Sequence, residues 1–263
     1  MAFNEYIKPI IHENYSIRLL ENEKELREFQ DLRYNHLILE FDPSKAESAD
    51  ENTTDDNMGY DDNNVQLCGF YRDPVTGKET LVGGYIIMRF KKEDDFCKAT
   101  LKYDLNKLFL QYKFKIMEVT RGVVHPTHRN GIVTKLLWDA IDAYMFQFDL
   151  RFIIGTMSFM GTDPLKYSQA ASYLHYNYRL PEEIMVRPLE SGAYYHEYLK
   201  KEDVCRKTAL RQIPPLLRGL MMIGARTCDG FYIDHDLGVI ETLAVLDFEN
   251  NYNLSNFGKL HLI

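Results

Sequence analysis

The chain has 263 residues, a formal net charge of −8 and 45% hydrophobic residues, which is typical of a globular protein with a sizeable core. The negative charge disfavours a general nucleic-acid binder, and no apolar run reaches the about 18 residues of a membrane-spanning helix. The 4 cysteines form no Cys-x-x-Cys pair. We therefore expect reduced thiols, no metal site and a cytoplasmic protein.

Hydrophobic spacing predicts the elements in chain order. Strands are expected at 15–20, 65–71, 80–90, 114–124, 151–158 and 239–248, and helices from Asn22 onward and at 132–148, 165–178 and 202–210. Asn22 followed by Glu25 resembles a capping box at a helix start. This order predicts one mixed α/β domain over residues 1–263, built in layers rather than as a barrel.

Residues 42–64 differ in composition from the rest of the chain. Their many acids face a single base, Lys45. Such runs are usually solvated loops, so we expect a flexible acidic loop; a lid over a cationic ligand is the alternative.

Two charges interrupt the apolar strand predicted at 114–124. Glu118 and Arg121 lie among residues such as Ile116, Val119 and Val123. Burying charges in a central strand is costly unless they are paired or face a cleft. The pair is either structural, or it places a carboxylate base beside a cationic orienting group.

The segments after two strands carry further candidate groups. The turn before the helix at 132–148 contains Arg129, Asn130 and Gly131, and Thr134 follows; a helix start with an arginine can bind an anion. The segment 155–164 places Ser158, Thr162 and Asp163 at a strand end, where ligands collect in open α/β sheets. Ordinary strand-to-helix loops are the alternative for both.

Three stretches together carry a family resemblance. Glu118-Val-Thr-Arg-Gly-Val-Val-His-Pro126, residues 153–164 and Ile213-Pro-Pro-Leu-Leu-Arg-Gly219 resemble the ornithine–acyl carrier protein N-acyltransferases and the related long-chain N-acyl amino acid synthases of the GNAT superfamily. The resemblance implies a GNAT-like, mostly antiparallel twisted sheet flanked by helices, with a helical C-terminal extension. It also implies transfer of a fatty or 3-hydroxy fatty acyl group from acyl carrier protein to the amine of a small amino acid such as ornithine, lysine or glycine.

The resemblance also assigns roles to residues. Glu118 and Arg121 match the catalytic glutamate and arginine of the family, and Arg33 and Asp61 match acceptor-binding residues. We add Ser158, Thr162 and Asp163 to the acceptor site. Thioester and phosphopantetheine binding is assigned to the strand end and the turn after it: Val119, Gly122, Val123, Val124, Arg129, Asn130, Gly131 and Thr134. No separate cofactor is expected, because the donor brings its own phosphopantetheine.

Residues 200–226 reverse the charge balance of the chain, with bases opposed only by Glu202 and Asp203. A basic patch suits docking of an acidic carrier protein, whereas a solvated helix face is the ordinary alternative. The proposed docking residues are Arg206, Lys207, Arg211 and Arg218. Residues 213–225 are nearly all apolar, which fits core, an acyl-tunnel wall or a peripheral contact with the inner membrane.

The sequence leaves two alternatives to this N-acyltransferase. An acyl-homoserine-lactone synthase would need S-adenosylmethionine, and the acidic loop and residues 213–226 fit it less well. A non-catalytic lipid- or carrier-protein-binding module is favoured by departures from the family pattern at Asn64, Ile86 and the turn at Arg129. Retention of Glu118 and Arg121 argues against it.

Overall fold

The computed structural model describes residues 5–40, 64–93, 95 and 97–249. Contacts divide the chain into two compact units: the described parts of 1–88 and 119–149 form the first, and those of 89–118 and 150–259 the second. Strand β6 (Ile116–Val124) contributes to both, because the division falls after Glu118. The predicted acidic loop up to residue 63, with Asp61, lies outside the described residues. A single domain over 1–263 stays a prediction.

In the first unit, β1 (Ile10–His12), β2 (Tyr15–Leu19), β3 (Val65–Arg72) and β4 (Glu79–Arg89) pair in that order, each antiparallel to the next. The latter part of β6 lies beside β4, and the amide of His125 after it donates to the Val82 carbonyl at 2.8 Å. The alternating residues of 15–20 and the apolar runs of 65–71 and 80–90 therefore form the strands they predict.

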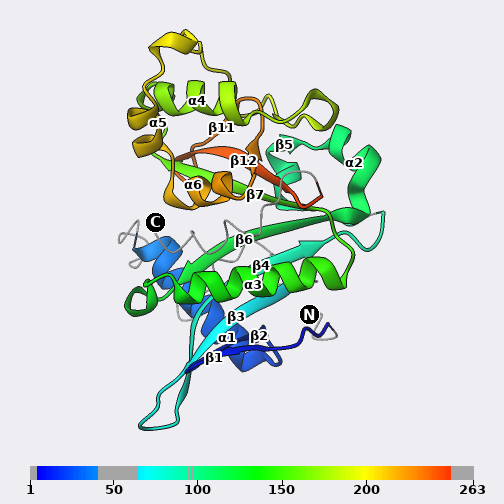
Figure 1. Ribbon diagram of the computed structural model, residues 1–263, viewed down its shortest axis with the longest axis vertical. Helices are drawn as coiled ribbons and strands as arrows, with labels where there is room; N and C mark the ends of the chain where they lie inside the picture. The colour runs from blue at the N-terminus through cyan, green and yellow to red at the C-terminus, as the bar shows by residue number, and fades with distance from the viewer. Residues whose placement is uncertain (1–4, 41–63, 94, 96, 250–263) are drawn as a thin grey trace. The chain divides into compact units, whose positions relative to one another are not determined.

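Two helices, α1 (Glu23–Arg33) and α3 (Ile132–Gln147), cover opposite faces of these strands (Figure 1). The consecutive glycines of β4 show this arrangement. A Cβ on Gly83 would lie 3.1 Å from Val133 of α3, whereas one on Gly84 would lie 2.9 Å from Phe29 of α1. Successive strand residues point to opposite faces, so both helices approach the backbone where side chains are missing.

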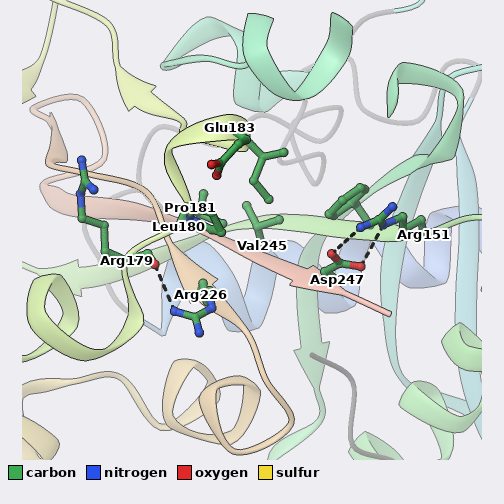
Figure 2. A pocket seen from close by; sticks show the side chains of 10 residues that line it. Arg151, Arg179, Leu180, Pro181, Glu183, Arg226, Val245 and Asp247 are labelled. Carbon is green, nitrogen blue, oxygen red and sulfur yellow. Dashed lines mark hydrogen bonds and ion pairs between the residues drawn. The ribbon is translucent and has the colours of Figure 1, made fainter. Parts of the chain in front are cut away.

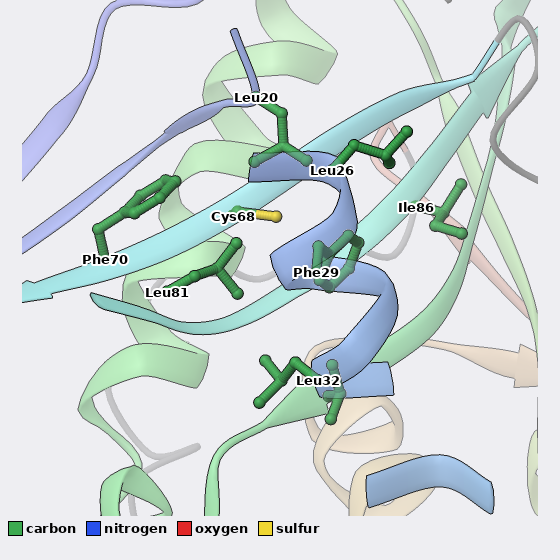
Figure 3. Packing of buried hydrophobic residues seen from close by; sticks show 9 residues of the cluster. Leu20, Leu26, Phe29, Leu32, Cys68, Phe70, Leu81 and Ile86 are labelled. Atoms are coloured by element: carbon green, nitrogen blue, oxygen red, sulfur yellow. The ribbon is translucent and has the colours of Figure 1, made fainter. Parts of the chain in front are cut away.

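Helix α1 begins as its capping signal predicts, with the Glu25 amide donating to Asn22 Oδ1 at 3.0 Å. Its apolar side packs on β3 and β4 (Figure 3). Leu26 and Phe29 meet Cys68 and Ile86 in this cluster. Ile86, which departs from the family pattern, is therefore a core residue here. The helix continues as a π-helix, η1 (Tyr34–Leu39).

In the second unit, the start of β6 pairs in parallel with β7 (Phe152–Met160), and β7 pairs antiparallel with β12 (Val239–Asp247). The far edge of β12 pairs antiparallel with β11 (Phe231–Asp234) and β10 (Arg226–Thr227), and β9 (Ala193–Tyr194) follows β11. Two short strands, β5 (Tyr103–Asp104) and β8 (Arg187–Pro188), form a separate ladder. The expected mixed, mostly antiparallel sheet flanked by helices is confirmed.

The helices of the second unit are α2 (Asn106–Tyr112), α4 (Ser168–Tyr178), α5 (Arg206–Gln212) and α6 (Pro215–Met222). Glutamines fasten α5 to α4: Gln212 Oε1 accepts from the Ala170 amide at 3.0 Å, and Gln169 Oε1 accepts from the Cys205 amide at 2.7 Å. Within the nearly apolar residues 213–225, Leu217 and Ile223 are fully buried, which favours the interpretation of this segment as core. None of the described helices has the length and apolar character to cross a membrane.

Candidate active site

Glu118 ends the parallel pairing of β6 with β7, which runs from Ile116 beside Phe152 to Glu118 beside Ile154. Its side chain is buried, with 3% exposure. The Lys98 amide donates to Oε2 and the Ala99 amide to Oε1, both at 3.0 Å. A buried carboxylate needs such donors, because an unsatisfied one costs several kcal/mol.

The two amides belong to the first residues of a short 3-10 helix, η3 (Lys98–Leu101). Cys97 precedes it and is buried. Burial, and secondly the charge of Glu118, raises the pKa of the Cys97 thiol far above its ordinary value. The thiol therefore stays protonated near neutral pH and is a poor nucleophile.

Arg121 has a left-handed backbone, with φ +53°, although it lies inside β6. Among the described non-glycine residues, Glu13 and Asp149 share this property, but both are in turns. Such a conformation costs on the order of 1–3 kcal/mol and is found preferentially at functional sites. At the next residue, Gly122, a Cβ would lie 2.1 Å from the Tyr85 ring. The proposed thioester-binding part of β6 is thus tightly constrained.

The turn after β6 was predicted to bind an anion, but in the structure its arginine is already bound to a carboxylate. The Arg129 guanidinium donates two bonds of 2.7 Å to Glu40, and its Nε donates to the Val124 carbonyl at 2.8 Å. The hydrogen bond from Arg129 lowers the pKa of Glu40 to about 2. Asn130 Oδ1 accepts from the Ile132 amide at 3.1 Å, so the first amide of α3 also has a partner.

The remaining members of the predicted thioester site lie in the same unit as this turn. Val119 and Val123 are buried side chains of β6. Gly131 supplies the left-handed N-cap of α3, with φ +89°, and Thr134 is half-buried on its first turn.

The predicted acceptor residues are not gathered in one place. Arg33 is fully buried at the end of α1 in the first unit, with its guanidinium carbon 4.7 Å from the Phe29 ring centre. In the second unit, Asp163 Oδ1 accepts from the Leu165 amide at 3.1 Å and so caps η6 (Pro164–Tyr167). Thr162 is exposed beside it.

Ser158 is instead the exposed member of a polar cluster around the buried Glu241, which the sequence analysis did not identify. Its hydroxyl donates to Glu241 Oε1 at 3.2 Å, and Glu241 Oε2 accepts from Lys102. Lys102 also contacts Asp234, at 2.6 Å. Burial alone would lower the pKa of Lys102, but Glu241 and Asp234 outweigh it and raise that pKa. The signal for Glu241 was present: it is an acid between apolar residues of a predicted strand, as Glu118 is.

Tyr103, the neighbour of Lys102, has a fully buried hydroxyl with no hydrogen-bond partner in the described part of the chain. Its ring lies 6.2 Å from that of Tyr232. Burial, followed by the charges of Cys228 and Glu241, raises the pKa of the Tyr103 phenol well above its ordinary value.

Three of the proposed docking bases, Arg206, Lys207 and Arg211, are exposed on α5. The fourth differs: Arg218 is half-buried on α6, and its guanidinium donates to the Leu210 carbonyl at 2.8 Å. A surface for an acidic partner would therefore be formed by the α5 residues.

A cavity of about 400 Å³ in the second unit is lined by Arg151, Arg179 and Arg226 together with apolar side chains (Figure 2). Asp247 accepts two bonds from Arg151, at 3.0 and 2.9 Å, and Asp229 accepts from Arg179 at 3.0 Å. Arg226 donates to the Arg179 carbonyl at 3.2 Å. Because two of the arginines are already neutralised and Glu118 does not line the cavity, we do not place the candidate centre there.

Within the described ranges, no group of three His, Cys, Asp or Glu side chains is arranged to hold a metal ion. The chain matches no family model. It is similar to an L-ornithine N(alpha)-acyltransferase from Brucella abortus (strain 2308), with 30% identity over 180 residues, 67% of this chain and 64% of that protein. The match thus spans less than two thirds of the relative's length.

A second L-ornithine N(alpha)-acyltransferase, from Rhodobacter capsulatus, is 26% identical over 239 residues, 89% of this chain and 90% of that protein. Among solved structures, FeeM, an N-acyl amino acid synthase from uncultured soil microbes, covers 95% of this chain and 99% of its own, at 8% identity and a TM-score of 0.50. That likeness concerns the fold alone. The resemblance drawn from the motifs is confirmed: the chain is a homologue of the L-ornithine N(alpha)-acyltransferases.

Proposed function

We propose that this chain is an N-acyltransferase that moves a fatty acyl group from the thioester of acyl carrier protein to the α-amine of ornithine or a similar small amino acid. Its relatives named as ornithine acyltransferases support the reaction class and the acceptor. The observation that carries the proposal is Glu118, a buried carboxylate held by two backbone amides where β6 and β7 stop pairing.

Glu118 is suited to act as the general base. An amino acid's amine is mostly protonated near neutral pH, and only its neutral form attacks a thioester. The two amides hold the carboxylate in one orientation on β6, which a general base needs in order to meet the amine proton directly or through a water. Base catalysis of this kind contributes about 10²–10⁴-fold. The strained backbone at Arg121, three residues on, supports a functional role for this strand.

The choice of donor rests on different residues. Arg206, Lys207 and Arg211 form an exposed basic surface on α5 of a protein with net charge −8. Acyl carrier proteins are acidic, so this surface would speed their association. Coenzyme A thioesters have no protein surface to meet these bases and should be poorer donors.

The direct test is to incubate the purified chain with ornithine, lysine or glycine and one acyl chain, carried either by acyl carrier protein or by coenzyme A. Mass spectrometry should show N(alpha)-acyl ornithine, formed faster from the carrier-protein donor. A homoserine lactone formed only with S-adenosylmethionine would indicate the synthase alternative. No acylated product with any pair would indicate a binding module.

The carrier-protein surface has its own test. Reversing the charges of Arg206, Lys207 and Arg211 together should reduce kcat/KM about tenfold for the carrier-protein donor at low salt, and less at high salt because exposed charges are screened. A short phosphopantetheine thioester should be used equally well by both proteins. Equal losses with both donors would place the damage in the fold or the acyl site.

A further inference from the structure

Glu118 and Glu241, two buried carboxylates of the second unit, project from the same face of its strands. Glu118 lies beside Ile154 of β7, and Ser158, four residues further along β7, lies beside Glu241 of β12. Residues separated by an even number of positions in a strand share a face, and paired residues lie side by side. Four residues span about 13 Å along a strand, so the two carboxylates are well separated on that face.

One short segment contacts both carboxylates. We call residues 97–104 the strap. At its start, the Lys98 and Ala99 amides donate to Glu118. At its other end, the Lys102 ammonium bridges Glu241 and Asp234. The Lys102 carbonyl also accepts from the Leu189 amide at 2.8 Å, and β5 of the strap pairs with β8.

The cluster around Lys102 is poorly placed to bind the acceptor itself. An amino acid whose α-amine meets Glu118 is too short to reach a group about 13 Å further along the strands. The oxygens of Glu241 and Asp234 are also already used by Lys102, Ser158 and the Leu237 amide. The strap is therefore the contact through which the cluster could influence Glu118.

We propose that Lys102 is a positioning residue for Glu118: by fastening the strap to Glu241 and Asp234, it holds the amides of residues 98 and 99 where they orient the Glu118 carboxylate. The proposal rests on the proposed role of Glu118 as base. A 3-10 helix as short as η3 has little stability of its own, so the direction of its first amides depends on how its ends are anchored.

Charged and titratable groups lie close to both Lys102 and Glu118. Asp234 of β11 and Glu241 of β12 contact Lys102, whose nitrogen also lies 5.7 Å from the Tyr232 ring centre. The Cys97 thiol lies within electrostatic range of Glu118. The raised pKa of Lys102 keeps its ammonium charged throughout the neutral range, so the anchor is permanent at working pH.

The test compares Lys102→Met with Lys102→Arg, which keeps the charge, and with Lys107→Met as a matched control. Lys107 belongs to the same unit and pairs with Glu182 at 2.7 Å, outside the strap. For each protein, kcat and KM are measured with ornithine and acyl carrier protein thioester across pH. Hydrogen exchange then follows the amides of residues 98 and 99.

Lys102→Met should lower kcat by about tenfold or more with little change in KM, since a small misplacement of a catalytic group is costly. With weaker amide bonds the ionised carboxylate is less stable, so the acidic limb of the kcat/KM profile should move to higher pH. The amides of residues 98 and 99 should exchange faster in Lys102→Met. Lys102→Arg should restore most of the kcat and most of the protection from exchange, and Lys107→Met should match the wild type.

The proposal would be overturned if the amides of residues 98 and 99 exchanged at the wild-type rate in Lys102→Met. It would also be overturned if Lys102→Met had the same pH profile as Lys107→Met although Glu118→Gln was inactive. If Lys102→Met does not fold, Glu241→Gln provides the same comparison with a weaker anchor. Failure of the proposed function would give a different result. The wild type would then acylate no amine, while the amides of residues 98 and 99 would still exchange faster in Lys102→Met.

Discussion

The two ends of strand β6 carry the same kind of sequence signal but hold their charges in different ways. At its start, in the second unit, Glu118 is 3% exposed and bound by two neutral amides. Just beyond its end, in the first unit, Arg129 is 42% exposed at its side chain and bound by the opposite charge of Glu40. One end is a fixed, buried acceptor, whereas the other is a surface ion pair.

The two ends therefore differ in the kind of partner that the structure shows for each charge. The amides of Lys98 and Ala99 carry no charge, so their hydrogen bonds do not cancel the negative charge of Glu118. An ion pair cancels the charge of both partners, so Arg129 can bind a phosphate only after Glu40 leaves. This contrast favours the Glu118 end of β6 as the site of the proposed reaction.

The largest expected effect comes from Glu118→Gln. It should reduce kcat/KM by more than about 10²-fold, because a glutamine cannot accept the amine proton. Its amide nitrogen also cannot accept a hydrogen bond, so one of the two strap amides loses its partner and stability falls by about 1–3 kcal/mol. Steady-state kinetics and urea unfolding measure the two effects. A folded Glu118→Gln protein with near wild-type turnover would move the base elsewhere.

A change at Gly122 of β6 should have a clear effect on stability. Gly122→Ala places a Cβ 2.1 Å from the Tyr85 ring, which must shift within a packed core. We expect a loss of about 1–3 kcal/mol in unfolding free energy, measured in urea. Combining it with Tyr85→Leu should cost less than the sum of the two single changes. Additive losses would show that the clash is relieved without moving Tyr85.

Much of the fold could be predicted because its elements carry local signals. Strand β2 alternates between buried and half-buried residues, α1 has its capping residue Asn22, and α3 has a long apolar stripe. Helix α2 was missed because its seven residues bury little more than Leu108. The short strands β5 and β8–β11 were missed because their pairing is set by distant parts of the chain, which no local pattern encodes.

The candidate site was predictable in part. An acid between apolar residues of a predicted strand identified Glu118, and the same pattern would have identified Glu241 in β12. The partners of these acids could not be predicted, because two of them are backbone amides and Lys102 comes from a segment without a distinctive pattern. Arg129 was assigned to the donor because a sequence does not show that Glu40 binds it.

A smaller effect is expected at the far end of β6. Arg129→Gln should change the KM for the acyl donor by less than about threefold, because in the wild type the guanidinium is bound to Glu40 and surface pairs contribute little. Glu40→Gln is the matched variant: it releases Arg129 and should lower the KM for a phosphate-bearing donor. A tenfold rise in KM for Arg129→Gln would mean that the ion pair opens when the donor binds.

The smallest effect concerns the pH dependence of the Glu40–Arg129 ion pair. The pKa of Glu40 is lowered from 4.5 to about 2, chiefly by the hydrogen bond from Arg129. A depressed carboxyl pKa adds stability that is present above pH 4.5 and is lost as pH falls toward 2. Because the pair is exposed, the gain should stay below about 1 kcal/mol and shrink with salt.

A carboxyl-carbon NMR titration of Glu40 measures that pKa directly. The midpoint should lie near 2 in the folded wild type, and Arg129→Gln should return it toward 4.5. His36, whose Nδ1 lies 3.1 Å from Glu40, provides the control. His36→Gln should move the midpoint less, because the hydrogen bond of His36 lowers the pKa of Glu40 less than that of Arg129 does. A wild-type midpoint near 4.5 would mean that the pair is open in solution. Arg129 would then be available to bind a phosphate, and Arg129→Gln should raise the KM for the donor.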